Sequence, residues 1–490
     1  MASSSLARRA TLAVVLMIGF YILGIVVAAS LLYVPYAMWA YLGRVNVQIA
    51  LFCIVTAGVI LLALVPRIDR FVAPGPKLEP SRHPRLFQEI NGIAKAVQQE
   101  LPKEVYLVAD MNAWVAQRGG VMGLGSRRVM GLGLPLLQLL TTSQLRAVLA
   151  HEFGHYYGGD TKLGPWIYKT RAAIVRAVEN LAEQSSMVQK PFIWYGNMFM
   201  RLTQAISRQQ EFTADALAAK TIGAAPLAEG LRQVHGASGA FDAYWYNEVT
   251  PVLNAGYRAP LAHGFAQFVA APTIADLITK SLETEIKEGQ TDPYDTHPPL
   301  RERLAAVAAL PAYASGQQFA NDPLSISLID DLPQLETELF TSLLEGHPAS
   351  PQLQFVSWEE TGARVFVPLW EELYNEQRTA LQGVTPQSLP EWAGKLAELG
   401  HKMRIKGKAW LTDEEATELA ASVLGCALAV SLHQRGATVE ALPGAAVRMQ
   451  IGTTIIEPFN AVRQLVAGEL TAADWLRQCE MSGILTQDLG

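Results

Sequence analysis

Two long apolar runs open the chain and predict a pair of membrane-spanning helices. No charged residue occurs between Thr11 and Gly43, and a second charge-free run extends from Val45 to Pro66. Each run can form a helix that crosses a hydrocarbon core of about 30 Å, which takes about 20 residues. Four aromatic residues near the end of the first run are typical of a membrane–water interface: Tyr33, Tyr36, Trp39 and Tyr41. We therefore expect a two-helix transmembrane hairpin within residues 1–70.

Basic residues lie mainly on one side of this hairpin. They are Arg8, Arg9, Arg67, Arg70 and Lys77, whereas the short connection carries only Arg44. By the positive-inside rule, the N-terminus and everything after the second run face the cytoplasm, as in an integral protein of the bacterial inner membrane. A cleaved signal peptide is the alternative, because residues 27–30 resemble a cleavage site, but the first run is long and a second follows. Neither run carries a charge, which favours an anchor over a transport pathway.

The rest of the pattern predicts a mainly helical α+β body. A proline-rich linker, residues 71–84, leaves the membrane, because proline cannot continue a helix. The sequence predicts helices over 86–99, 413–432 and 459–467, a strand over 105–110, strand-like stretches over 114–129 and 446–456, and mostly helix from 141 to about 310 with an interruption near 236–264. Loops at 311–324 and 346–351 then divide a body domain, 85–310, from a mixed α/β C-terminal domain, 325–490.

The charge-free segment 191–200 is too short to cross a bilayer as a helix. Burial in the protein core is the favoured interpretation, and contact with the membrane surface is the alternative.

Composition narrows the class of protein. Only 17% of the 490 residues are charged, the net charge is −6, and the mean hydropathy is +0.16. No basic stripe occurs, which argues against a nucleic-acid partner. Residues 1–75 carry a net charge of +4, so the remaining residues carry −10. Three scattered cysteines make a disulfide framework or a cysteine-based zinc site implausible.

The strongest chemical signal is the sequence HEFGH at residues 151–155. Thr141 and Gln144 form a capping-box pattern, and glycines at 158 and 159 are expected to end the helix. His151 and His155 lie one helical turn apart, so both imidazoles can hold one metal ion. Glu152 lies about 100° around the axis, where its carboxylate can take a proton from a water molecule on that ion.

A catalytic zinc site needs a third protein ligand, and the best candidate is Glu211 in SRQQEFTAD. Alanines at 214, 216, 218 and 219 would permit close packing of its helix. Asp215, one turn after Glu211, can accept a hydrogen bond from the far nitrogen of a ligand histidine. Asp160 could play the same part or be an ordinary loop acid. His297, in THPP, is either a site residue or a turn histidine.

The hairpin, HEFGH, SRQQEFTAD and THPP together resemble the HtpX-like and CAAX-prenyl-protease-like zinc metallopeptidases, a gluzincin family, over residues 85–305. The resemblance implies a zincin-type catalytic domain with one Zn²⁺ per chain on His151, His155 and Glu211, Glu152 as general base, Asp215 beside a ligand, and His297 near the site. It also implies that Asn112, Ala113 and Trp114 lead into an edge strand that binds extended substrate.

The main hypothesis is therefore a membrane-anchored zinc metalloendopeptidase that hydrolyses protein or peptide substrates with zinc-activated water. A rival is a membrane-anchored adaptor with a structural zinc and a partner-binding C-terminal domain. A third possibility is a latent enzyme whose C-terminal domain covers the cleft. The sequence leaves the substrate and the oligomeric state open.

Overall fold

The computed structural model describes residues 2–65, 71–119, 125–156, 164–182, 186–289, 297–311, 322–344, 353–405, 408 and 410–490. The chain forms two compact units. The first comprises residues 1–236 and 280–342, and the second comprises 237–279 and 343–490. Helices dominate both units and the sheets are small, which confirms the predicted mainly helical α+β class.

The elements of the first unit are α1 (Ala2–Leu42), α2 (Val47–Leu64), β1 (Lys77–Leu78), α3 (Pro84–Ala96), β2 (Glu104–Val108), β3 (Ala113–Arg118), β4 (Arg127–Gly133), α4 (Leu134–Leu139), α5 (Thr142–Gly154), α6 (Gly164–Ala182), α7 (Ser186–Thr221), α12 (Leu300–Ala308) and α13 (Leu332–Leu344). Three helices begin in one unit and end in the other: α8 (Ala224–Tyr244), α11 (Pro272–Glu288) and α13, whose last two residues belong to the second unit.

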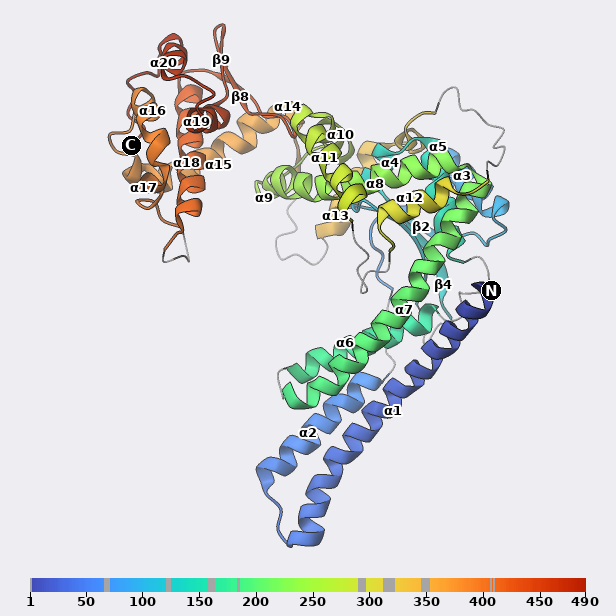
Figure 1. Cartoon of the computed structure of the whole chain (residues 1–490). Helices are drawn as coiled ribbons and strands as arrows, with labels where there is room; N and C mark the ends of the chain where they lie inside the picture. The colour runs from blue at the N-terminus through green and yellow to red at the C-terminus, as the bar shows by residue number, and fades with distance from the viewer. Residues whose placement is uncertain are drawn as a thin grey trace. The chain divides into compact units, whose positions relative to one another are not determined.

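Helices α1 and α2 form the predicted hairpin (Figure 1). Asn46 caps α2, because its side-chain oxygen accepts hydrogen bonds from the backbone N–H groups of Gln48 and Ile49. Leu64 lies over Gly24, where an added methyl group would meet Leu64 Cδ1 at 2.7 Å. The end of α2 is therefore level with the middle of α1.

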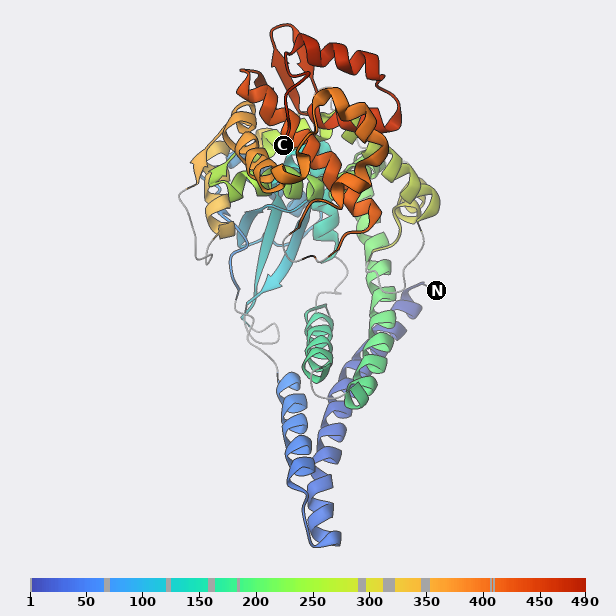
Figure 2. The same cartoon turned by 90° about the vertical axis from the view of Figure 1, so that its left-hand side faces the viewer.

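A second helical pair, α6 and α7, packs against the hairpin (Figures 1 and 2). The shared core contains Phe20 of α1, Ile60 of α2, Ile174 of α6 and Phe199 of α7, each fully or almost fully buried. One face of the first half of α1 is thus covered by α6 and α7.

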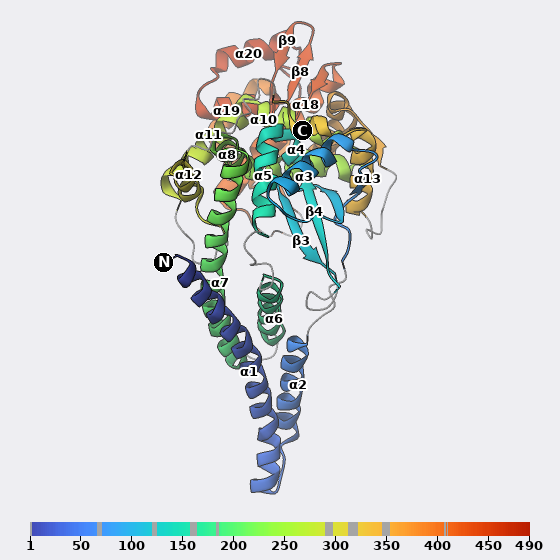
Figure 3. The same cartoon turned by 90° about the vertical axis from the view of Figure 1, so that its right-hand side faces the viewer.

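A four-stranded sheet lies beside the helices that carry the chemistry. Its strand order is β1-β2-β4-β3, with β2 parallel to β4 and the other pairs antiparallel. Strand β3 therefore forms one edge. Figure 3 shows α3 and α5 against this sheet, and α5 contacts both α3 and β3.

The second unit is built around α18 (Asp413–Gln434). Its other elements are α9 (Thr250–Asn254), β5 (Tyr257–Arg258), α10 (Leu261–Ala270), β6 (Gln354–Phe355), α14 (Trp358–Thr361), α15 (Val367–Gln377), α16 (Leu389–Trp392), α17 (Leu396–Gly400), β7 (Thr438–Glu440), β8 (Arg448–Ile451), β9 (Thr454–Ile456), α19 (Pro458–Ala467) and α20 (Ala472–Met481). Strands β7, β8 and β9 form an antiparallel sheet.

Among the described residues, three helices are long and apolar enough to cross a membrane: α1 from Thr11, α2 and α18. The bent pair α10–α11, with an angle of 76°, would make a fourth. Helix α18 differs from the first two because its apolar residues fill the core of its own unit. It begins with three acidic residues after a Thr412 cap, as in water-soluble helices.

Several predicted boundaries need correction. The helix that carries HEFGH ends at Gly154, before the predicted stop at glycines 158 and 159, which lie outside the described residues. The strand-like stretch 114–129 is two strands, β3 and β4. The predicted interruption near 236–264 begins later, because α8 continues to Tyr244 and passes into a π-helical turn. The predicted linker contributes β1, which pairs with β2. The predicted domain limits remain predictions.

Candidate metal centre

Helix α5 presents the two histidines from a firmly fixed position. Thr141 and Gln144 make the predicted capping box. Asp322 accepts hydrogen bonds from the backbone N–H and hydroxyl of Ser143 in the first turn. At the other end, the rings of His151 and His155 lie with their centroids 4.8 Å apart. One ring nitrogen of each histidine and one carboxylate oxygen of Glu152 lie within 4.8 Å of one another, so Glu152 lies beside the histidine pair.

Glu211 reaches this pair because α5 and α7 pack unusually closely. A methyl group added to Gly154 would meet the Ala214 Cα at 2.9 Å, and both residues are fully buried. Small residues at such a crossing let two helix backbones approach. Glu211 lies on the same helix, one turn before Ala214, and its buried carboxylate is directed at the histidines.

The distances fit a zinc ion held by three ligands. Glu211 Oε2 lies 3.4 Å from His151 Nε2, and Glu211 Oε1 lies 3.5 Å from His155 Nε2. Zinc–nitrogen and zinc–oxygen bonds of about 2.1 Å in a tetrahedron place neighbouring ligand atoms about 3.4 Å apart. Each histidine nitrogen thus lies at the spacing of neighbouring ligands from one of the two Glu211 oxygens.

The environment of Glu211 also favours a bound cation. Its Oε2 atom is buried and has no hydrogen bond of good geometry, although it lies 3.2 Å from His297 Nδ1 and 3.5 Å from Arg303 Nη1. A buried carboxylate oxygen without such a bond is costly. Coordination of a metal ion would satisfy it. The residues present thus fit the zinc that the sequence predicts.

A buried ion pair between Asp215 and Arg303 lies on the Nδ1 side of the His151 ring. Asp215 Oδ1 lies 2.8 Å from His151 Nδ1. The Arg303 guanidinium donates to both Asp215 oxygens, from Nε at 2.9 Å and from Nη2 at 2.7 Å. Since Nδ1 donates to the carboxylate, Nε2 of His151 keeps its lone pair for a metal.

Burial and charge set the protonation of the site. Burial raises the pKa of Glu152 to about 7, with the nearby Glu211 carboxylate adding to the rise. Burial lowers the pKa of His155 to about 4, so this imidazole is neutral and ready to coordinate. Burial also opposes the charged form of His151, but bonds to Asp215 and Glu211 outweigh it and raise its pKa to about 9. In the absence of a metal ion His151 therefore carries a second proton on Nε2, and a metal ion that binds this nitrogen takes the place of that proton.

The edge strand β3 passes close to the end of α5. Asn112 precedes β3, and Ala113 and Trp114 begin it. The Asn112 carbonyl accepts a hydrogen bond from the β4 side, so the alternation of an antiparallel pair directs the backbone groups of Val115 away from β4. The Tyr156 hydroxyl donates to the Val115 carbonyl at 2.9 Å, which ties this edge to the HEFGH segment.

The structure describes every predicted site residue outside HEFGH except Asp160. Glu211, Asp215 and His297 are brought to the histidines, whereas Asp160 lies outside the described residues. The Asn112–Trp114 segment lies at the start of the edge strand.

Arg303, which is buried between Asp215 and Glu211, was not among the predicted site residues. Its sequence, LRER, is that of an ordinary exposed helix. The available signal was the place predicted for Asp215 beside a ligand histidine, because a carboxylate held at such a centre calls for a cationic partner.

Part of the chain is similar to known peptidases. The model of peptidase family M48 matches residues 80–310. The curated protein "Protease HtpX homolog" of Archaeoglobus fulgidus is 22% identical over 243 residues, which cover 47% of this chain and 68% of that protein. No solved structure matches the chain. The match to the family model covers HEFGH, Glu211, Asp215, His297 and Arg303.

Proposed function

We propose that this chain is a membrane-anchored zinc metalloendopeptidase that cleaves protein or peptide substrates, and the match of residues 80–310 to the model of peptidase family M48 supports this proposal. The observation that carries the proposal is the convergence of His151, His155 and Glu211 at ligand spacing, with Glu152 beside them.

In this proposal each residue has one part. His151, His155 and Glu211 hold one zinc ion. When bound, zinc supplies a Lewis acid that polarises the scissile carbonyl and acidifies water. Glu152 accepts the proton of the attacking water and passes it to the leaving amine, for which a pKa near 7 is well placed.

Further residues orient the metal ligands, stabilise the charge that develops on the substrate and bind the peptide. Asp215 orients His151, and Arg303 keeps Asp215 ionised and fixed. His297 is exposed, and its Nδ1 lies at the edge of the site, where the ring can donate to the negative oxygen that forms on the substrate. The peptide lies along β3, whose outward backbone groups offer strand pairing with little dependence on side chains.

The membrane hairpin places this chemistry beside the bilayer. The arrangement of basic residues supports a cytoplasmic active site in a bacterial inner membrane. Proteins with a segment near the membrane surface are therefore the expected substrates.

The test is Glu152→Gln in the full chain. We expect the variant to keep one zinc per chain and to lose about 10²- to 10⁴-fold in peptide hydrolysis, because the proton acceptor is gone while the ligands remain. Metal analysis and cleavage of an unfolded protein such as casein measure the two quantities. Zinc retention with a wild-type cleavage rate would refute the role of Glu152.

The same variant separates the rival adaptor function. An adaptor with a structural zinc would retain its cellular function after the Glu152→Gln substitution, since its fold and metal are unchanged. A protease would lose that function together with the cleavage.

A further inference from the structure

The free edge of β3 offers backbone groups to a partner at every second residue. The Gly133 N–H donates to the Asn112 carbonyl at 2.8 Å, and β3 pairs with β4 in unbroken antiparallel register from Ala113 to Arg118. Residues 112, 114 and 116 therefore direct their N–H and C=O groups at β4, whereas residues 113, 115 and 117 direct theirs away from it. A peptide that pairs with this edge meets the second set.

One residue of this second set already has a hydrogen-bond partner. The Tyr156 hydroxyl donates to the Val115 carbonyl at 2.9 Å. Tyr156 directly follows His155, and its backbone N–H donates to the Phe153 carbonyl at 3.0 Å, so its backbone continues the HEFGH segment. The Val115 acceptor is therefore satisfied by a residue next to the candidate metal centre before any peptide binds.

The Tyr156 ring is held in place independently of its hydroxyl. The Arg128 guanidinium lies over this ring, with its central carbon 4.3 Å from the ring centroid, as in a cation–π contact. Arg128 belongs to β4 and is itself fixed, because its Nη1 donates to the Glu100 carbonyl at 2.7 Å. The surrounding structure thus aims the hydroxyl at Val115.

A satisfied acceptor changes what is lost when a bound peptide lacks one N–H. A carbonyl that is covered by a peptide without a donor has no hydrogen bond, and such a group is costly. Proline is rare at paired strand positions because it has no N–H to donate. At Val115 this cost does not arise, since the Tyr156 hydroxyl already donates to the oxygen. Among the described residues, no side chain donates to the carbonyls of Ala113 or Gln117, where the cost remains.

We propose that Tyr156 is a specificity-determining residue that lets this edge accept a substrate residue without an N–H, such as proline, opposite the Val115 carbonyl. The peptide pairs with the backbone of Ala113 and Gln117, and it need not supply a donor between them. Extended segments with proline at this one paired position are therefore substrates as well as ordinary extended segments. The inference rests on the proposed peptidase function and adds to it a rule for the segments that fit.

The experiment uses the full chain in detergent and a peptide that the wild type cleaves at one bond. Each derivative of the peptide has one backbone N–H replaced by an ester oxygen, away from the scissile bond, and kcat/KM is measured for each. Since only every second N–H of an extended peptide faces β3, the replacement should lower kcat/KM at alternate residues, by about fivefold or more. In the wild type the residue opposite Val115 should be insensitive.

The variant Tyr156→Phe removes the hydroxyl and keeps the ring over Arg128. In this variant the insensitive residue should become sensitive, again by about fivefold or more, because the Val115 carbonyl now depends on the peptide. Proline at the same residue should show the same change relative to the wild type. A general loss of stability would lower kcat/KM for all derivatives alike and would add no sensitive residue.

Tyr106→Phe is the matched control. It removes a tyrosine hydroxyl that donates to Glu104 at 3.1 Å on β2, which lies between β1 and β4 and away from the free edge of β3. This variant should keep the wild-type pattern. If Tyr156→Phe also keeps that pattern, the inference is overturned while the proposed function stands. If the wild type cleaves no peptide, the proposed function is overturned and the inference with it.

Discussion

Replacing Arg303 by leucine should destabilise the first unit far more than the removal of an equally short surface pair. Arg303 Nη2 and Asp215 Oδ1 are 2.7 Å apart, and their side chains are 5% and 2% exposed. Arg85 Nη2 and Asp330 Oδ1 are also 2.7 Å apart, but these side chains are 57% and 42% exposed. The two pairs therefore differ in burial and not in distance.

Burial decides the expected magnitude. Loss of Arg303 leaves the Asp215 carboxylate buried with only His151 beside it, and removing one partner of a buried pair costs about 3–5 kcal/mol. Loss of Arg85 leaves a carboxylate that water can solvate, which costs about 0–1 kcal/mol. The double variant Asp215→Asn/Arg303→Leu should cost less than the sum of the single variants, because the stranded charge is absent.

Thermal unfolding of the full chain in detergent, with zinc removed by a chelator, measures these differences. At about 2–4 °C per kcal/mol, Arg303→Leu should lower the Tm of the first unit by at least about 6 °C, and Arg85→Leu by no more than about 4 °C. The zinc affinity of Arg303→Leu should also fall about 10- to 100-fold, because His151 loses its orientation. Equal Tm values for the two leucine variants would refute the argument from burial.

Three further predictions concern packing, pH and metal removal. Gly154→Ala should destabilise the first unit by about 1–3 kcal/mol and weaken zinc binding, since its methyl group meets α7, whereas Gly92→Ala, in open space on α3, should be neutral or stabilising. Calorimetry and zinc titration of both variants measure these effects, and equal behaviour of the two would contradict the close crossing of α5 and α7. Burial lowers the pKa of His83 below its unfolded value of about 6.5, so its contribution to stability should be full above that pH and should be lost as the pH falls below it. His83→Gln should remove this part of the pH dependence. Parallel curves of Tm against pH for the wild type and the variant would contradict the prediction. Chelation of zinc should lower the Tm of the wild type but not that of Glu211→Gln, and an equal drop in both would remove Glu211 from the ligand set.

The residues of the candidate metal centre were most predictable where metal binding requires a pattern of neighbouring residues in the sequence. HEFGH lies on a helix with a readable cap, and the need for a third ligand pointed to Glu211, which the structure brings to both histidines. The hairpin and α18 were predictable because long apolar or capped runs leave few alternatives. Arg303 was not, because its burial depends on a helix far away in the sequence.

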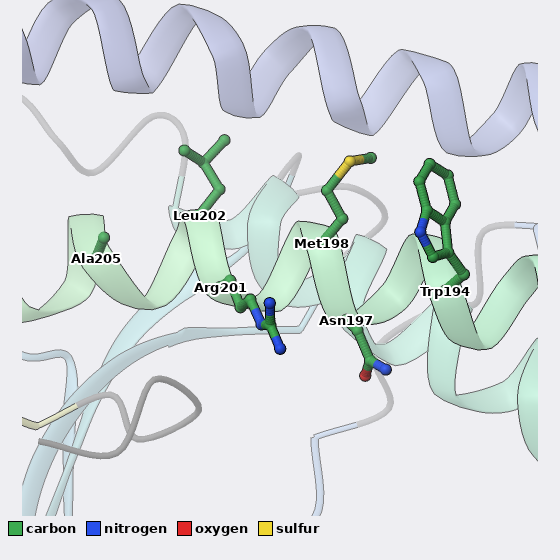
Figure 4. A pocket seen from close by; sticks show the side chains of 6 residues that line it. All are labelled: Trp194, Asn197, Met198, Arg201, Leu202 and Ala205. Carbon is green, nitrogen blue, oxygen red and sulfur yellow. The ribbon is translucent and has the colours of Figure 1, made fainter.

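The exposed and buried faces of α7 were also hidden from the sequence, since nearly every residue of 191–200 is apolar or aromatic. Only the position of α1, which runs beside α7 in Figure 4, decides that Phe192 is covered and that Trp194 is not. The packing of α1 against α6 and α7 also explains why the apolar run of α1 is longer than a single crossing of the bilayer core requires. From Gly24 to Leu42, α1 spans about 28 Å, enough for a bilayer core, and its earlier apolar residues pack against α6 and α7.

The continuity of α7 connects the membrane surface with the candidate metal centre. Arg201 and Glu211 lie on one helix, ten residues and about 15 Å apart, whereas both histidines belong to the α5 segment. A tilt of about 5° over that length displaces the Glu211 carboxylate by about 1.3 Å, well beyond the roughly 0.2 Å within which ligand distances must agree. The close crossing at Gly154 and Ala214 resists such a tilt from one side. Contacts of α7 with α1, such as the hydrogen bond from the Tyr195 hydroxyl to the Leu16 carbonyl, resist it from the other, so the geometry of the third ligand depends on how α1 holds this helix.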